Sequence, residues 1–383
     1  MSSQATKNIE FITSDLGLAE HCSQWGSQEF IAFDSEFERR DTFYPKVGLF
    51  QVCDKQACYL IDPLRISNWK PLSELLQSNT EIVMHSAGED LNLVVTLLGV
   101  TPAILFDTQL AAAFSGIGFS LGYQSLMQAL HAVALPKSET QSNWLKRPLT
   151  DRQIEYAAMD VTYLYDSRAP LNEALRLKRT TDWFQEENEA LIDTARRVED
   201  EQTWALAYCG FGSAWQLKDE GLALLQQLAY WREKEARKRN KPKSWILKDQ
   251  DIFRTIQAAE VAGRAQTPGL ISSDRRSLQR YSTVVSEILQ QRPYDLPTPD
   301  RDKLVYPLPA RYRGLLKQLQ ARARDVANDL GIAEEMLSRK RGINSLLLTY
   351  HRKGSLEWPR ELGEWRRHVL MDEFSRLVLA SRN

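Results

Sequence analysis

Cysteine is scarce in this chain of 383 residues, and the four that are present are scattered. Cys53 and Cys58 are separated by four residues, but Cys22 and Cys209 lie far away, so no second pair completes a zinc site. This usage excludes a disulfide-built fold and favours reduced thiols, as in the cytoplasm.

Long apolar runs are also missing. No stretch approaches the roughly 18 consecutive apolar residues of a transmembrane helix. The first seven residues lack the apolar core of a signal peptide. Hydrophobic residues make up 43% of the chain and charged residues 26%, which is the balance of a globular protein. We expect a cytoplasmic protein with two or three domains, no membrane contact and no obligate protein partner, hence a monomer.

Charge is divided unevenly along the chain, although the net charge is only −1. Residues 1–170 contain 12 Lys and Arg against 20 Asp and Glu, whereas residues 219–383 contain 31 against 21. An acidic front and a basic back indicate different roles for the two halves. The basic half suits a polyanionic partner, although a charged stretch is more often only a solvated face.

Strand and helix signals alternate over the first 170 residues, which predicts an α/β domain with a mixed sheet covered on both faces. Strands are expected at 9–12, 31–37, 47–53, 57–61, 81–85 and 103–106. From about residue 150 onward the pattern is helical, with helices expected at 151–166 and 171–207. Two small all-α units follow, around a proline-rich stretch at 292–299. The predicted domains are 1–210, 215–295 and 305–383.

The stretch from Ile31 to Phe37 alternates between apolar and acidic residues in the order Ile-Ala-Phe-Asp-Ser-Glu-Phe. In an extended strand, Asp34 and Glu36 therefore share one face. Two neighbouring carboxylates repel each other, and a divalent cation, which prefers carboxylate oxygens, would relieve the repulsion. The alternative is an edge strand with one solvated face.

Three later features add to this strand. Asp90 lies in the first turn of a helix that follows the strand at 81–85, where the helix dipole stabilises an anion. Tyr156 and Asp160 are four residues apart, so they share a helix face. The loop from Ser142 to Leu149 combines Trp, Lys and Arg, a mixture expected near a nucleic-acid strand.

In this order, the motifs around Asp34 and Glu36, Asp90, and Tyr156 and Asp160 resemble the DEDD superfamily of 3′→5′ exonucleases. The Tyr-x3-Asp spacing resembles its tyrosine subclass, and the tandem helical units resemble HRDC domains. One departure is Asn143, where the family pattern has Asp, but this position lies outside the carboxylate set. The resemblance implies a ribonuclease H-like exonuclease domain, followed by two small HRDC-like domains.

The resemblance also implies a two-metal phosphodiester hydrolase that uses Mg²⁺ or Mn²⁺ and releases 5′-nucleoside monophosphates. Asp34, Glu36, Asp90 and Asp160 would hold the ions. Tyr156 would orient the attacking water, because a phenol with a pKa near 10 is a poor base at neutral pH. RNA, and tRNA precursors in particular, is the substrate that the resemblance implies. Hydrolysis of DNA and a role as a non-catalytic nucleic-acid scaffold remain as alternatives.

Basic and aromatic residues outside the carboxylate set are the candidates for nucleic-acid binding. The residues from Trp231 to Lys243 include seven basic and only two acidic side chains. A patch of this kind beside a nuclease domain favours contact with a polyanion. The residues that we expect to bind nucleic acid are Trp144, Lys146, Arg147, Arg237, Lys238, Arg239 and Lys241.

Overall fold

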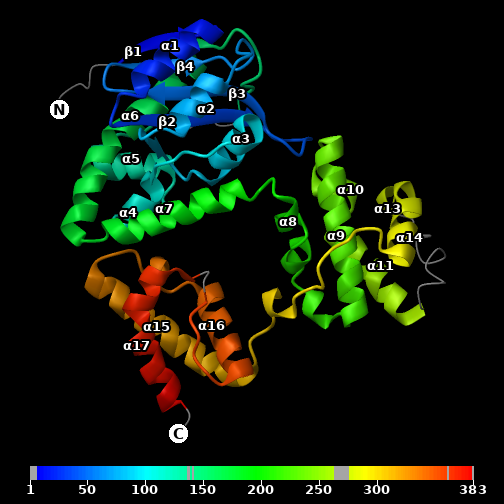
Figure 1. The fold of residues 1–383 in the computed structure, drawn as a ribbon. Helices are drawn as coiled ribbons and strands as arrows, with labels where there is room; N and C mark the ends of the chain where they lie inside the picture. The colour runs from blue at the N-terminus through cyan, green and yellow to red at the C-terminus, as the bar shows by residue number, and fades with distance from the viewer. Residues whose placement is uncertain (1–6, 136–138, 140–141, 263–275, 360–361, 382–383) are drawn as a thin grey trace. The chain divides into compact units, whose positions relative to one another are not determined.

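The computed structural model describes residues 7–135, 139, 142–262, 276–359 and 362–381 (Figure 1). Packing divides the chain into two compact units. The first contains the residues up to Glu38, Lys46–Arg196 and those from Leu308 on, and the second contains Arg39–Pro45 and Arg197–Pro307. The three domains predicted from the sequence do not coincide with these units, because the first, 1–210, includes Arg39–Pro45 and the start of Arg197–Pro307. That division stays a prediction, which limited proteolysis of the intact chain would test.

The first unit is built on a six-stranded mixed sheet, as the alternating pattern predicts. β3 is antiparallel to its two neighbours, β2 and β4, and the other paired strands are parallel. The order across the sheet is β1 (Asn8–Ile12), β4 (Ala57–Ile61), β3 (Lys46–Cys53), β2 (Phe30–Glu38), β5 (Glu81–Met84) and β6 (Leu105–Asp107). β2, which carries the two acidic residues, is therefore an inner strand and not an edge.

Helices cover both faces of this sheet (Figure 1). Apolar residues of α1 (Asp15–Trp25), α2 (Lys70–Leu76) and α3 (Gly88–Leu98) form one core with the sheet. On the other face lie α4 (Thr108–Phe114), α5 (Tyr123–His131) and α6 (Asp151–Lys178), and α6 packs against β2, β3, β4 and β5. α7 (Thr181–Arg196) packs against α3, α4 and β6.

The helix boundaries after residue 150 differ from the sequence prediction. Pro170 lies inside α6, which continues to Lys178, although we expected a helix that ends near residue 166. Proline removes one backbone hydrogen bond, but Leu171 and Leu175 are fully buried and hold the helix against the core beyond it. The chain breaks instead at Arg179, whose φ of 57° places it in the left-handed region.

The last helices belong to the first unit. These are α15 (Arg313–Leu330), α16 (Lys340–Lys353) and α17 (Glu364–Ala380), with short 3₁₀ turns at Ala310–Tyr312 and Glu334–Met336. Trp365 stacks on Trp183 of α7 with ring centroids 5.1 Å apart. Arg366, which is 1% exposed, forms an ion pair with Glu187 of α7. These contacts make the C-terminal helices part of one hydrophobic core with α4, α6 and α7.

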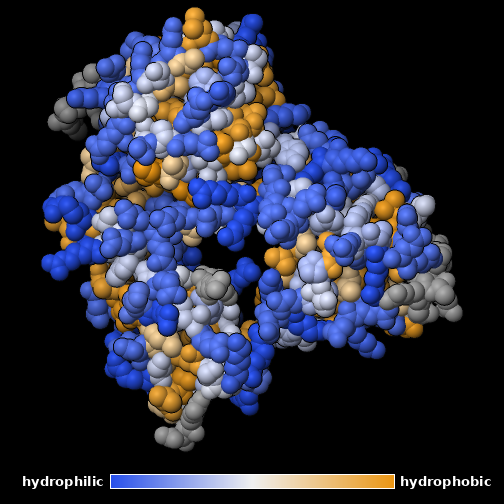
Figure 2. All heavy atoms as spheres, viewed as in Figure 1, coloured by the Kyte–Doolittle hydropathy of each residue, from blue (hydrophilic) through white to orange (hydrophobic). Residues whose placement is uncertain are grey.

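The second unit is helical and has its own core around α9 (Asp219–Arg239). Its other helices are α8 (Glu201–Trp204), α10 (Lys243–Ile246), α11 (Asp249–Ala262), α13 (Arg276–Arg280) and α14 (Ser282–Gln291), with 3₁₀ turns at Ala207–Gly210, Ala214–Gln216 and Arg301–Lys303. Figure 2 shows hydrophilic residues over most of the visible face, with hydrophobic residues in smaller patches among them. In the described ranges, none of the helices has the length and apolarity that a membrane crossing requires.

Candidate active site

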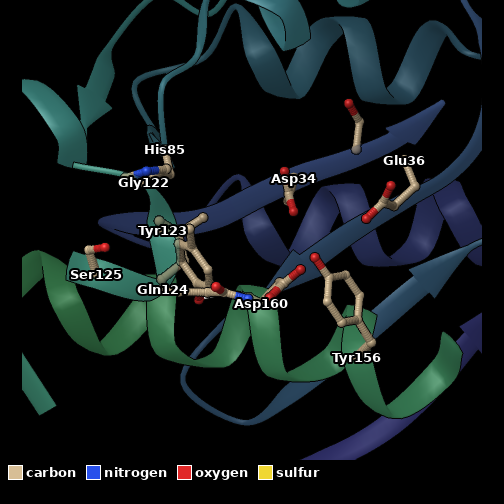
Figure 3. Close-up of a pocket in the computed structure, with 11 residues that line it drawn as sticks. Asp34, Glu36, His85, Gly122, Tyr123, Gln124, Ser125, Tyr156 and Asp160 are labelled. Atoms are coloured by element: carbon tan, nitrogen blue, oxygen red, sulfur yellow. Dashed lines mark hydrogen bonds between the residues drawn. The ribbon is translucent and has the colours of Figure 1, made fainter. Parts of the chain in front are cut away.

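Asp34 and Glu36 point from β2 toward α6 (Figure 3). In the sheet register Asp34 lies opposite Gln51 and Glu36 opposite Leu49 on β3. The register shifts between Glu36 and Phe37, which ends the regular pairing just after the second carboxylate. The alternation of the sequence thus places both acids on the same side of an inner strand.

α6 supplies the other half of the site. A capping box formed by Thr150 and Gln153 fixes where the helix begins. Tyr156 and Asp160 follow one turn apart and face Asp34 and Glu36 (Figure 3). The Tyr156 hydroxyl donates a hydrogen bond to the Asp160 carboxylate. The position of the cap therefore sets which helical residues meet the strand.

A cavity of about 460 Å³ lies between β2 and α6. It is large enough to admit a nucleotide-sized group and is lined mainly by polar side chains. Its lining residues are Asp34, Ser35, Glu36, His85, Gly122, Tyr123, Gln124, Ser125, Tyr156, Asp160 and Leu164. The structure thus brings four of the five predicted catalytic residues to one cavity, although at least 120 positions separate the pair on β2 from the pair on α6.

Asp90, the fifth, lies in the first turn of α3 beside this cavity and does not line it. The hydroxyl of Ser35 donates a short hydrogen bond to its carboxylate. Ser35 is on the opposite face of β2 from Asp34, so this bond ties the helix that follows β5 to the catalytic strand. Asp90 is near enough to Asp34 for the charge of one to raise the pKa of the other.

The four carboxylates destabilise one another's charged forms. Burial raises the pKa of Asp34 to about 6. Burial and the charges of Asp34, Asp160 and Asp90 raise the pKa of Glu36 to about 9. Burial, followed by the charge of Asp34, raises the pKa of Asp90 and of Asp160 well above the ordinary range. A group of this kind needs a positive partner to be fully ionised at neutral pH.

The chemistry of this donor set fits a hard divalent cation. Among the described residues that line the cavity none is Lys or Arg, so no side chain there neutralises the acids. Gln51, opposite Asp34, is fully buried with neither amide atom hydrogen-bonded. In the described ranges no three acidic, His or Cys side chains converge closely enough to form a preformed metal cage.

Trp144 and Arg147, which we expected to bind nucleic acid, make contacts within the protein. Trp144 is 2% exposed and packs against Tyr156 with ring centroids 6.1 Å apart. Gly48 on β3 allows this approach, because a Cβ there would lie 2.5 Å from the Cβ of Trp144. Arg147 donates to both oxygens of Asp62, at 2.8 and 2.6 Å. The Arg147 side chain is still 25% exposed, and Lys146 is exposed. Binding of nucleic acid by Trp144, Lys146 and Arg147 stays a prediction.

The four basic candidates in the second unit differ in their environment. The side chain of Arg237 is 9% exposed and pairs with Glu199 and Glu233. Lys238 is exposed. Arg239 pairs with Glu235 on the surface, and Lys241 donates to the backbone oxygen of Asp41 at 3.1 Å. Binding of nucleic acid by Arg237, Lys238, Arg239 and Lys241 stays a prediction.

Several residues of the cavity had no signal in the sequence. Tyr123 is the first residue of α5 and donates a short hydrogen bond to the backbone oxygen of Asp160. His85 packs against Tyr123 and bonds through Nδ1 to the Thr108 hydroxyl at 2.9 Å. Burial lowers the pKa of His85, so its ring is neutral. A tertiary contact identifies both residues as part of the site, since each reaches the cavity from its own element.

Comparisons with known proteins agree with this geometry. A family model described as 3′-5′ exonuclease matches residues 9–176, and a model described as the ribonuclease D C-terminal HRDC domain matches residues 310–374. The chain is 35% identical to ribonuclease D of Pseudomonas paraeruginosa, over 94% of each chain. It is 32% identical to ribonuclease D of Escherichia coli, over 97% of this chain and 98% of that protein.

A solved structure extends the likeness to three dimensions. The crystal structure of Escherichia coli RNase D, whose title calls it an exoribonuclease involved in structured RNA processing, superposes with a TM-score of 0.83. That match has 29% sequence identity and covers 97% of this chain and 99% of the other. The agreement therefore includes the helical regions as well as the sheet.

Proposed function

Because this chain belongs to the ribonuclease D family and is a 3′-5′ exoribonuclease, we propose that it trims the 3′ ends of structured RNAs, tRNA precursors among them. The observation that carries this proposal is the meeting of Asp34, Glu36, Tyr156 and Asp160 at one cavity. The RNA-processing role of the Escherichia coli protein supports the choice of substrate. The protein would act in the cytoplasm, as a monomer.

Enzymes of this family depend on divalent metal ions, and we propose two of them, Mg²⁺ or Mn²⁺, at this site. Asp34, Glu36 and Asp160 would hold one ion, and Asp34 would share the second with Asp90. When bound, such ions lower the pKa of a water molecule and neutralise the charge that develops on phosphate and leaving oxygen. The pKa values of all four carboxylates are raised, which supports this assignment, because a nearby cation would stabilise their ionised forms.

Tyr156 would orient the attacking water. Burial and the charges of Asp160 and Glu36 raise the pKa of its phenol further above its already high value. It therefore keeps its proton at neutral pH and acts as a hydrogen-bond donor and not as a base. Its bond to Asp160 holds the ring in place beside the carboxylates, with Trp144 packed behind it. Attack at the terminal phosphodiester would release 5′-nucleoside monophosphates.

One experiment tests the proposal. The protein is incubated with 3′-labelled RNA, and with DNA of the same sequence, in Mg²⁺, Mn²⁺ or EDTA, and the products are identified. We expect 5′-mononucleotides from RNA, none in EDTA, and none from the Asp160→Asn variant. Equal release of mononucleotides from DNA would contradict RNA as the substrate class. No release from either polymer would favour a binding scaffold.

A further inference from the structure

In the second unit, one aromatic side chain is exposed within a basic segment of the sequence. From Ala236 to Lys248 the chain contains six Lys and Arg and no Asp or Glu. Trp245 lies within this segment, on the short helix α10, and is 55% exposed. Tryptophan is highly buried on average in proteins, so an exposed tryptophan in a basic segment is a candidate for contact with a binding partner.

The backbone around Trp245 is firmly held. The two residues that follow it, Ile246 and Leu247, are 1% and 0% exposed in the core of the second unit. The buried guanidinium of Arg232 donates to the backbone oxygen of Leu247 at 2.8 Å. The backbone N–H of Trp245 donates to the backbone oxygen of Pro242 at 2.8 Å. The indole is thus displayed by an anchored segment and not by a loose loop.

The charges beside the ring are only partly neutralised. The ammonium of Lys241 lies 5.5 Å from the centroid of the Trp245 ring, in the range of a cation–π contact. Lys238 and Lys248 are exposed, and among the described residues neither has a side-chain partner. By contrast, Lys241 pairs with Asp41 at 3.6 Å and Lys243 with Glu233 at 2.7 Å. Uncompensated positive charge therefore remains on both sides of the indole in the sequence.

We propose that Trp245 is a stacking platform for an unpaired base of single-stranded RNA, with Lys238, Lys241 and Lys248 facing its phosphates. Base–aromatic stacking beside a basic groove is how single strands are bound without sequence preference. Such a platform would bind the unpaired 3′ part of a structured RNA substrate. The inference rests on the proposed RNA substrate and assigns a binding site to the second unit.

A protein partner fits this surface less well. Protein interfaces bury an apolar centre within about 1,000 Å² or more of contact. The exposed residues nearest to Trp245 in the sequence are polar or basic, namely Lys243, Ser244 and Lys248, and add no apolar surface to the ring. A single-stranded nucleic acid fits better, because its phosphates complement the lysines and each of its bases has a flat face that can stack on the indole.

The test is a binding experiment with the full chain in EDTA, which keeps a metal-dependent enzyme from degrading the probe. Fluorescein-labelled single-stranded oligoadenylate and a blunt RNA duplex are titrated, and fluorescence anisotropy gives Kd. Stacking of one base is worth about 1–3 kcal/mol, so we expect Trp245→Ala to weaken single-strand binding about 5- to 150-fold. Binding of the duplex, whose bases are already stacked, should change less than about twofold. Trp245→Phe should keep most of the affinity.

Two controls separate the stacking from other effects. Phe11 is also an exposed aromatic residue, 50% exposed on β1, and Phe11→Ala should leave both affinities unchanged. Trp245→Ala should keep the salt dependence of single-strand binding. The double variant Lys238→Gln, Lys248→Gln should reduce the slope of log K against log salt concentration by about 1.4, because two phosphate contacts are lost. Unchanged single-strand affinity in Trp245→Ala, with an unchanged melting temperature, would overturn the inference. So would an equal loss on the duplex, or no recovery in Trp245→Phe. Because nothing is hydrolysed in this assay, its result is independent of whether the proposed catalytic function holds.

Discussion

Replacement of Asp34 by Asn should abolish hydrolysis and, at the same time, stabilise the metal-free protein. The pKa of Asp34 rises from 3.8 to about 6 on folding, mainly because the carboxylate is buried. At about 1.36 kcal/mol per pKa unit, this difference of about two units corresponds to about 3 kcal/mol of lost stability when Asp34 is ionised. Asparagine has nearly the same shape but no charge, so it removes this term.

The sign of the pH dependence follows from linkage. Since the folded-state pKa of Asp34 is the higher one, the native state binds the proton more tightly than the unfolded state. The penalty is absent below pH 4, grows as the pH rises toward 6, and is complete at pH 8. The stabilisation by Asp34→Asn should therefore be about 3 kcal/mol at pH 8 and roughly half of that at pH 5.

Thermal unfolding in EDTA measures this effect. At about 2 °C per kcal/mol for a unit of this size, we expect the melting temperature of Asp34→Asn to exceed that of the wild type by roughly 6 °C at pH 8. Asp372→Asn, which changes an exposed Asp of α17, is the matched control and should show no shift. A melting temperature at pH 8 that is unchanged or lower in Asp34→Asn would refute the electrostatic reasoning, as would a gain that does not depend on pH.

Further predictions concern the surroundings of the site. Tyr156→Phe should lower kcat roughly tenfold to a hundredfold with little change in KM, since only the orientation of the water is lost; steady-state kinetics on a short oligonucleotide measure this, and an unaltered kcat would remove Tyr156 from the mechanism. Trp144→Ala should destabilise the protein by about 3–5 kcal/mol in urea unfolding, because a buried indole leaves a cavity; a shift below 1 kcal/mol would contradict its structural role. Arg366→Met should cost about 3 kcal/mol, because Glu187 loses its buried partner and keeps the more exposed Arg339 at 3.5 Å, and Glu187→Gln in the same chain should recover part of that loss; no recovery would argue against the ion pair as the contact that matters.

The parts of this protein that local rules describe could be predicted from its sequence. Alternation placed Asp34 and Glu36 on one face of a strand, and the four-residue spacing placed Tyr156 and Asp160 on one face of a helix. The mixed sheet covered by helices followed from the order of strand and helix signals. Each of these depends on the period of a single element, which the sequence states directly.

The parts that depend on tertiary packing could not be predicted. The composition of the loop around Trp144 suggested an RNA contact, yet its indole fills the space behind Tyr156. Tyr123 reaches Asp160 from a helix without any motif. The docking of Trp365 on Trp183 joins residues more than 180 positions apart. In each case the residue that makes the contact lies on another element, and the periodicity of the sequence does not identify it.

The central claim is that carboxylates from β2 and α6 hold the metal ions together. Titration of the metal-free protein with Mn²⁺, followed by isothermal calorimetry or by the loss of the free-ion EPR signal, tests it most directly because it does not depend on activity. The wild type should bind Mn²⁺, and Asp160→Asn should bind it at least tenfold more weakly while Asp372→Asn binds it as the wild type does. Equal Mn²⁺ binding by the wild type and Asp160→Asn would contradict the account.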